Sequence, residues 1–317
     1  MTFTQKLAAC AVAAFGIFAT NTAANAQTAF AIGNGGTTLI SFDVSNPGAA
    51  TVVASFSGAT TGLDAIDFRP LTTTLYGYND IADSLFTIDT TTGVTTLVAN
   101  STATTGATNS QIGGLDFNPA IDRVRFVNID SENRVYNPNA ATAAVAQTTL
   151  AYAAADSGND GTGPSIVENA YNNNLAGTAG TQYAIDNARG TLVTLANAAG
   201  TLNTVGSLGL GTAPDIFTPA IGSEAGFDIF TSISGVNTAY AILGTNTGGG
   251  IGSSFYTVNL GTGLASAPTG SFSSALGSVY SLAVVPVVVP EANTGLLVGV
   301  VGLLGMVGAT LRRRAAK

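Results

Sequence analysis

A short motif that occurs twice in full constrains this 317-residue chain more than any other feature. The sequence Asp-Phe-Asn-Pro spans residues 116–119, and Asp-Phe-Arg-Pro spans residues 67–70, which lie 49 residues earlier. Each copy closes an apolar strand at a proline, which cannot donate to a sheet ladder, and a second apolar strand follows a short turn. A weaker copy surrounds Asp228. The chain is therefore predicted to be a repeat of small β units.

Segments of strand, turn and strand recur along the rest of the chain. The predicted strands include residues 29–32, 38–43, 51–54, 75–78, 84–89, 94–98, 182–186 and 254–259. A period in the forties is typical of a β-propeller, so residues 27–289 are predicted to form about six blades of roughly 45 residues each. An array of β-sandwiches is the alternative architecture. Residues 137–174 fit the repeat worst and are predicted to form a longer insertion.

The ring of blades also needs a closure that protects its edge strands. The segment at residues 278–284 matches the strands that precede the prolines elsewhere. We expect it to lie beside the first strand at Phe30. No helix of convincing period is found before the C-terminal tail, and 46% of the residues are hydrophobic, which provides enough apolar side chains for a sizeable core.

The side chains that the sequence lacks exclude most catalytic chemistry. The chain has no histidine, its one cysteine is Cys10, and its lysines are Lys6 and Lys317. Between the chain ends it therefore cannot build a Ser-His-Asp triad, a Cys-His pair, a lysine Schiff base, or a zinc or copper site of imidazoles and thiolates. Glycoside hydrolysis by two carboxylates is the chief enzymatic route that remains.

The acidic residues are nevertheless predicted to be structural. Asp67, Asp116 and Asp228 share one repeat position, which favours a role at a turn or a strand end over catalysis. Repeated aspartates of this kind are expected to accept backbone hydrogen bonds at tight turns. Glu132 and Glu168 do not recur, and neither does Glu224; these are the better acid candidates, yet each is predicted to be a solvated loop residue. We assign no catalytic residues.

Aromatic residues offer only weak support for a carbohydrate cleft. Tryptophan is absent, so the aromatic contact area that such a cleft usually needs would have to come from other rings. Tyr76, Tyr78 and Tyr171 are the candidates for this role.

Two further clusters of polar residues have the composition of binding sites. Arg123 and Arg125 alternate on one strand, and with Asp116 and Asp122 nearby they are predicted to form a structural ion-pair cluster. Residues 156–161 place oxygen-bearing side chains at alternating positions, as calcium loops do. Position 158 is glycine, however, and Glu168 lies one residue too late for the usual bidentate ligand. Calcium at this loop is a hypothesis; otherwise no cofactor and no metal site is predicted.

Both ends of the chain indicate export. Residues 1–26 contain Lys6, an apolar run over residues 7–19, and Ala24 and Ala26 in a small-x-small pattern, so signal peptidase is predicted to cleave after Ala26. The sequence that ends at Cys10 also matches a lipoprotein cleavage box, but the apolar core follows this cysteine rather than preceding it.

The C-terminal tail at residues 290–317 combines three parts. Pro290 and Glu291 precede an apolar run at residues 295–311, and Arg312, Arg313 and Arg314 follow it. As a helix the run would reach about 25 Å across a hydrocarbon core of about 30 Å, with the arginines on the cytoplasmic side. The tail resembles a PEP-CTERM sorting signal, although Ala292 replaces the second proline. This resemblance implies processing by an exosortase in a bacterium that makes extracellular polysaccharide; a plain membrane anchor is the alternative.

A second resemblance covers most of residues 29–285. The segments that carry it include residues 112–119, 122–125, 133–138, 170–174, 183–186 and 200–206, and the most specific part runs from Asp-Phe-Asn-Pro to Asp-Arg-Val-Arg. These segments look like the domain-of-unknown-function family 4394. The resemblance implies an exported, propeller-like domain and brings no catalytic residues with it.

The net charge of the predicted exported portion limits which binding partners are suitable. All 18 acidic residues lie between Asp43 and Glu291, where only five arginines oppose them, giving this portion a net charge of −13. It has no basic patch, so nucleic acid is an unsuitable partner. Extracellular polysaccharide remains a candidate. We therefore predict an exported, non-enzymatic structural or glycan-binding protein of the cell surface or matrix, and a carboxylate-dependent glycan hydrolase or lyase is the alternative.

Overall fold

The computed structural model describes residues 27–98, 112–140, 144–156, 159, 163–210, 225–246 and 251–287. The predicted signal peptide and the predicted sorting tail both lie outside these ranges, and they stay predictions. Within the described ranges, no helix is long and apolar enough to span a membrane.

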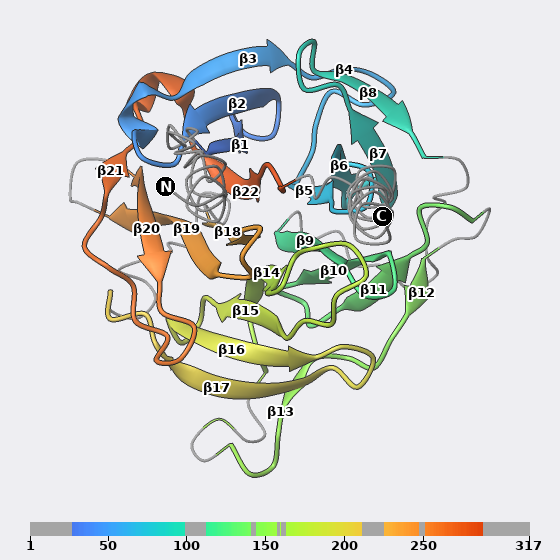
Figure 1. Cartoon of the computed structure of the whole chain (residues 1–317), viewed down its shortest axis with the longest axis vertical. Helices are drawn as coiled ribbons and strands as arrows, with labels where there is room; N and C mark the ends of the chain where they lie inside the picture. The colour runs from blue at the N-terminus through green and yellow to red at the C-terminus, as the bar shows by residue number, and fades with distance from the viewer. Residues whose placement is uncertain are drawn as a thin grey trace, which may run out of the picture.

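In the described ranges, five mainly antiparallel sheets stand around a central axis like the blades of a propeller (Figure 1). The prediction of an all-β propeller is therefore confirmed, and the prediction of six blades is wrong. Positions that correspond on successive inner strands fall at residues 67, 116, 170, 228 and 283, so the repeat is 49 to 58 residues long and not about 45. The longer repeat arises because the connections between blades are long.

The first blade joins the two ends of the described chain. Its order from the axis outward is β22 (Tyr280–Val284), β1 (Thr28–Gly33), β2 (Thr38–Asp43) and β3 (Thr51–Ser55). Phe30 pairs with Ala283, which confirms the predicted closure and leaves neither strand as a free edge. The β1–β2 hairpin turns through Asn34, Gly35 and Gly36, all with positive φ, which glycine adopts without steric cost.

The next two blades contain the complete copies of the motif. The second blade consists of β5 (Ala65–Arg69), β6 (Thr74–Asn79), β7 (Ser84–Ile88) and β8 (Val94–Leu97), with β4 (Ser57–Gly58) added parallel to β8. The third blade consists of β9 (Gly113–Asn118), β10 (Arg123–Asn128), β11 (Asn133–Tyr136) and β12 (Val145–Ala146). In both blades the Asp-Phe-x-Pro motif forms the end of the inner strand and the turn that follows it.

The last two blades complete the ring. The fourth blade consists of β14 (Ile166–Tyr171), β15 (Gln182–Asp186), β16 (Thr191–Ala196) and β17 (Thr201–Ser207), with β13 (Ala151–Tyr152) parallel to β17. The fifth blade consists of β18 (Ala225–Thr231), β19 (Asn237–Asn246), β20 (Ile251–Val258) and β21 (Gly270–Ser271). Residues 137–174, which fitted the repeat worst, therefore supply the outer strand of one blade and two strands of the next. Two 3-10 turns, η2 (Pro47–Ala49) and η3 (Ser274–Leu276), complete the elements in the described ranges.

The core lies between the blades, where the faces of neighbouring sheets pack together. Between the second and third blades, for example, Tyr76 packs edge-on against Phe117 with ring centroids 5.0 Å apart. Similar apolar layers join the first blade to the second and to the fifth, and the fourth to the fifth. Because each inner strand contacts the inner strands of both neighbours, the order around the axis is β22, β5, β9, β14 and β18. This ring of inner strands brings together residues far apart in sequence.

Candidate functional site

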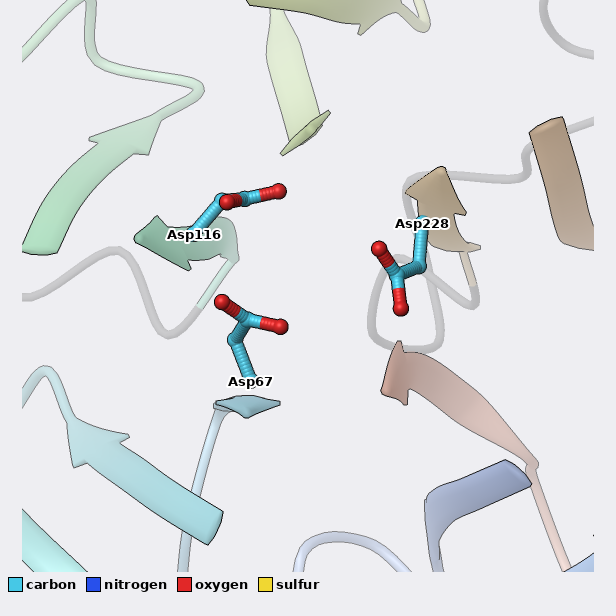
Figure 2. Close-up of side chains that lie close together, drawn as sticks. All are labelled: Asp67, Asp116 and Asp228. Carbon is cyan, nitrogen blue, oxygen red and sulfur yellow. The ribbon is translucent and has the colours of Figure 1, made fainter. Parts of the chain in front are cut away.

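Three buried carboxylates meet on the axis of the propeller. Asp67 comes from β5, Asp116 from β9 and Asp228 from β18, and each side chain is no more than 2% exposed. One carboxylate oxygen from each residue lies within 4.8 Å of the corresponding oxygens of the other two. Figure 2 shows the three carboxylates directed toward a shared space. The repeat position singled out in the sequence is thus the position that faces the axis.

Each of these aspartates accepts a backbone hydrogen bond from the next blade. Phe117 N–H donates to Asp67 (2.9 Å), Tyr171 N–H to Asp116 (2.9 Å) and Val284 N–H to Asp228 (2.6 Å). The predicted role as acceptors of backbone hydrogen bonds is therefore confirmed, but the predicted location is wrong. The aspartates lie within inner strands rather than at tight turns, and they join neighbouring blades.

The remaining two blades use different residues at the axis. Ala170 and Ala283 precede Tyr171 and Val284, and so occupy the positions that aspartate takes elsewhere. Two residues before these alanines stand Glu168 and Ser281, both buried. The Ser281 hydroxyl accepts a hydrogen bond from Ile66 N–H (2.9 Å) of the second blade. Ser281 has a φ of 44°, at an irregularity in the β1–β22 pairing, a backbone conformation that serine adopts at some cost in energy.

Glycines on the neighbouring inner strands make room for Glu168 and for the backbone at Ser281. A Cβ added to Gly114 would lie 2.7 Å from a Glu168 carboxylate oxygen, and one added to Gly226 would lie 2.9 Å from the Ser281 backbone. Gly114 and Gly226 each stand two residues before an axial aspartate. The inner strands therefore fill the axis in two ways, three with an aspartate and two with a residue two positions earlier, and the glycines permit the close approach of their neighbours.

The electrostatic environment of this cluster is unfavourable for ionised carboxylates. Burial, followed by the charge of Asp228, raises the pKa of Asp67 well above its usual range. Burial and the charges of Asp67 and Asp228 do the same to the pKa of Asp116, and burial and Asp228 raise the pKa of Glu168. The pKa of Asp228 is also raised by burial, with backbone hydrogen bonds opposing the shift. Such a set is stable only when protons or a cation neutralise it.

The arginines that the sequence placed near this cluster have other partners. Arg125 donates to the Tyr171 hydroxyl (3.2 Å) and to the Asn197 carbonyl (3.0 Å), and Arg123 donates to the Asp122 carbonyl (2.9 Å). Asp122 instead forms a bidentate ion pair with Arg69 of the neighbouring blade. The predicted cluster of Arg123 and Arg125 with Asp116 and Asp122 is therefore not formed, because Arg125 points toward the amide and tyrosine groups of the fourth blade.

The glutamates and tyrosines considered for an enzymatic or glycan-binding cleft do not line a common cleft in the described residues. Glu132 pairs with Arg134, and Glu168 lies in the axial ring, so neither is the solvated loop residue that was predicted. Glu224 lies outside the described residues. The tyrosines considered for stacking on sugars, Tyr76, Tyr78 and Tyr171, are at most 6% exposed and cannot present a ring face to a glycan.

The loop considered for calcium is only partly described. The Asp156 carboxylate accepts hydrogen bonds from Thr204 N–H and from the Asn159 amide, and the Asn159 carbonyl accepts one from Arg189 (2.9 Å). Calcium at this loop stays a prediction.

The ring of five sheets and its closure by β22 and β1 define the protein as a five-bladed β-propeller. Residues 38–283 match the family described as a domain of unknown function, DUF4394, and the chain belongs to that family. This confirms the resemblance proposed for its central part. No curated protein matches the chain in sequence.

Two solved structures illustrate the range of similar folds. One chain of a nidogen/laminin complex is 9% identical with a TM-score of 0.46, and the alignment covers 82% of this chain and 98% of that chain. A structural-genomics protein of unknown function from Bacteroides thetaiotaomicron is 14% identical with a TM-score of 0.42, over 74% of this chain and 56% of that one. The present chain thus spans about half the length of the second protein.

Proposed function

We propose that this protein is an exported, non-enzymatic component of the bacterial cell surface or extracellular matrix, with a structural or glycan-binding role. The observation that carries the proposal is the environment of the two described glutamates that were candidates for a catalytic acid. Glu132 is paired with Arg134, and Glu168 is buried on the axis. A glycosidase needs two carboxyl groups about 5–10 Å apart on either side of a substrate that enters a cleft. The described glutamates do not meet this requirement.

The two chain ends support the export part of the proposal. The signal-peptide pattern that ends at Ala26 and the tail with Pro290, Glu291 and the triple arginine together indicate secretion followed by sorting. Signal peptidase and an exosortase-type enzyme are the implied processing partners. Burial of the three candidate tyrosines favours a structural role over recognition of sugars by aromatic stacking.

The experiment follows the full-length protein through export and then tests its partner. The protein is recovered from the cell-surface and extracellular fractions of its host, its intact mass is measured, and it is mixed with the extracellular polysaccharide of the same host. We expect a mass that lacks residues 1–26 and the C-terminal arginines, retention on the polysaccharide or on other matrix components, and no new reducing ends.

Three outcomes would contradict the proposal at different steps. A mass that retains Arg312, Arg313 and Arg314 would show that the tail is a plain anchor. Cytoplasmic recovery of the unprocessed chain would overturn export. New reducing ends that disappear in Glu132→Gln, Glu168→Gln or Glu224→Gln would establish the alternative function as a glycan hydrolase or lyase, with Asp130→Asn as the matched control because Asp130 is an exposed acidic residue.

A further inference from the structure

The axial aspartates lack the counter-charge that buried carboxylates normally have. Within the described ranges, the four ion pairs join Arg69, Arg134 and Arg189 to carboxylates away from the axis. Asp67, Asp116 and Asp228 accept hydrogen bonds from backbone N–H groups, which orient one oxygen of Asp67, one of Asp116 and both of Asp228. Those bonds do not cancel three charges that approach each other within 4.8 Å, and burial makes their mutual repulsion stronger.

The Asp116 carboxylate has an oxygen that no group in the described structure satisfies. Asp116 Oδ1 is buried and has no hydrogen-bond partner, although its carboxylate is directed into the space shared with Asp67 and Asp228 (Figure 2). Asn169 is fully buried, and both its amide nitrogen and its carbonyl oxygen are unpartnered. Buried polar groups are nearly always satisfied, so these exceptions require an explanation.

We propose that Asp67, Asp116 and Asp228 bind one calcium-sized divalent cation on the axis of the propeller. Carboxylate oxygens are the preferred ligands of hard divalent cations, and a Ca²⁺–O distance of about 2.3–2.6 Å places opposite ligands about 5 Å apart. The oxygens of the three aspartates, within 4.8 Å of one another, fit that size. Magnesium, with ligands at about 2.0–2.1 Å in a strict octahedron, would hold opposite oxygens only about 4 Å apart.

The site would neutralise the cluster and stabilise the ring at the same time. The ligands come from the inner strands of the second, third and fifth blades, which are not all adjacent to one another. Water molecules on the cation would complete its coordination. This site is separate from the loop at residues 156–161.

The test measures metal content and thermal stability on the full-length chain in detergent. After removal of metal with EGTA, the chain is equilibrated with calcium chloride, separated from free metal, and analysed by elemental mass spectrometry. We expect one calcium per chain and a rise in the unfolding midpoint of about 5 °C or more in millimolar calcium, with a smaller rise in magnesium. Absence of bound calcium together with an unchanged midpoint would overturn the proposal, and so would a larger rise in magnesium than in calcium.

Variants locate the site. Asp116→Asn and Asp67→Asn each keep an oxygen that can accept the backbone hydrogen bond while removing a charge, so both are expected to fold and to lose the calcium and the shift in the midpoint. Exposed Asp130→Asn is the matched control and should retain both. Asp156→Asn distinguishes the other candidate loop: loss of the calcium in this variant, with retention in Asp116→Asn and Asp67→Asn, would place the cation in that loop and contradict the axial site.

Discussion

The interface between the second and third blades contains two buried acidic groups that have different partners. Near the outside of the blades, Asp83 of the second blade is bound by Arg134 of the third at 2.7 Å and by the Tyr136 hydroxyl at 2.5 Å. At the axis, Asp67 and Asp116 each accept a backbone hydrogen bond. The charge of Asp67 also acts on Asp116 and raises its pKa. Both groups are at most 2% exposed.

Position within the blade explains the difference. Arg134 lies on β11, the third strand from the axis, where the space between two blades holds a long side chain alongside Tyr78 and Tyr136. At the axis five inner strands converge. Gly114 and Gly226 lie so close to the neighbouring inner strands that a Cβ at either position would clash. A compact ion can neutralise aspartates there without needing the room of an arginine. The comparison shows that a buried carboxylate between the blades is paired with an arginine, whereas the described partners of the carboxylates on the axis are backbone N–H groups.

The largest effect is predicted for a variant that breaks the ion pair between Asp83 and Arg134. Arg134→Met leaves Asp83 buried without its cation, and we expect a loss of about 3–5 kcal/mol in the free energy of unfolding, measured by urea denaturation. Adding Asp83→Asn should recover part of this loss, because the uncompensated charge is then removed. Arg123→Met is the control: Arg123 donates to backbone carbonyls at a partly exposed site, so a change of about 0.5 kcal/mol or less is expected. Equal losses in Arg134→Met and Arg123→Met would refute the interpretation.

A smaller effect is predicted for the axial group in metal-free buffer. Asp67→Ala leaves the buried Phe117 N–H without an acceptor, which costs about 1–3 kcal/mol. Asp67→Asn keeps a carbonyl oxygen for this bond and relieves the repulsion, so it should be at least as stable as the wild type in EGTA. The free energies of unfolding of both variants are compared with that of Asp130→Ala. If Asn proves as harmful as Ala, the aspartate acts through its charge and not as an acceptor.

The smallest effect concerns pH and a carboxylate away from the axis. Burial raises the pKa of Asp64 to about 6; the Asp80 N–H hydrogen bond opposes this shift and the Asp80 charge adds to it. Since the folded state binds this proton more tightly, the stability from Asp64 is fully present below about pH 4 and is lost as pH rises through about 6. The Asp64→Asn variant, which does not titrate, should therefore gain stability relative to the wild type between pH 4 and 7 at constant calcium. A difference that does not change with pH would contradict the raised pKa.

Much of the fold follows from local sequence patterns. Apolar segments such as residues 84–89 and 182–186, with their turns, predicted strands that the structure contains, and the segment at residues 278–284 predicted the closure at Phe30. The number of blades was not predictable from the complete motif, because only two blades contain Asp-Phe-x-Pro and the connections between blades vary in length. The sequence repeat did not identify Glu168 as an axial residue. Its blade has Ala170 at the position of the aspartates, and Glu168 stands two residues earlier.

The sequence by itself determined the β class, the repeat, the chemistry that the missing histidine and cysteine exclude, and the shared position of Asp67, Asp116 and Asp228. Tertiary structure alone decided that these aspartates converge, that Arg125 turns away from them, and that Arg69 pairs with Asp122 across a blade interface. Alternation of apolar residues and turn formers is encoded within a few neighbouring positions, so it can be recognised locally. The axial site depends on the curvature that closes five sheets into a ring, which no segment of the chain encodes alone.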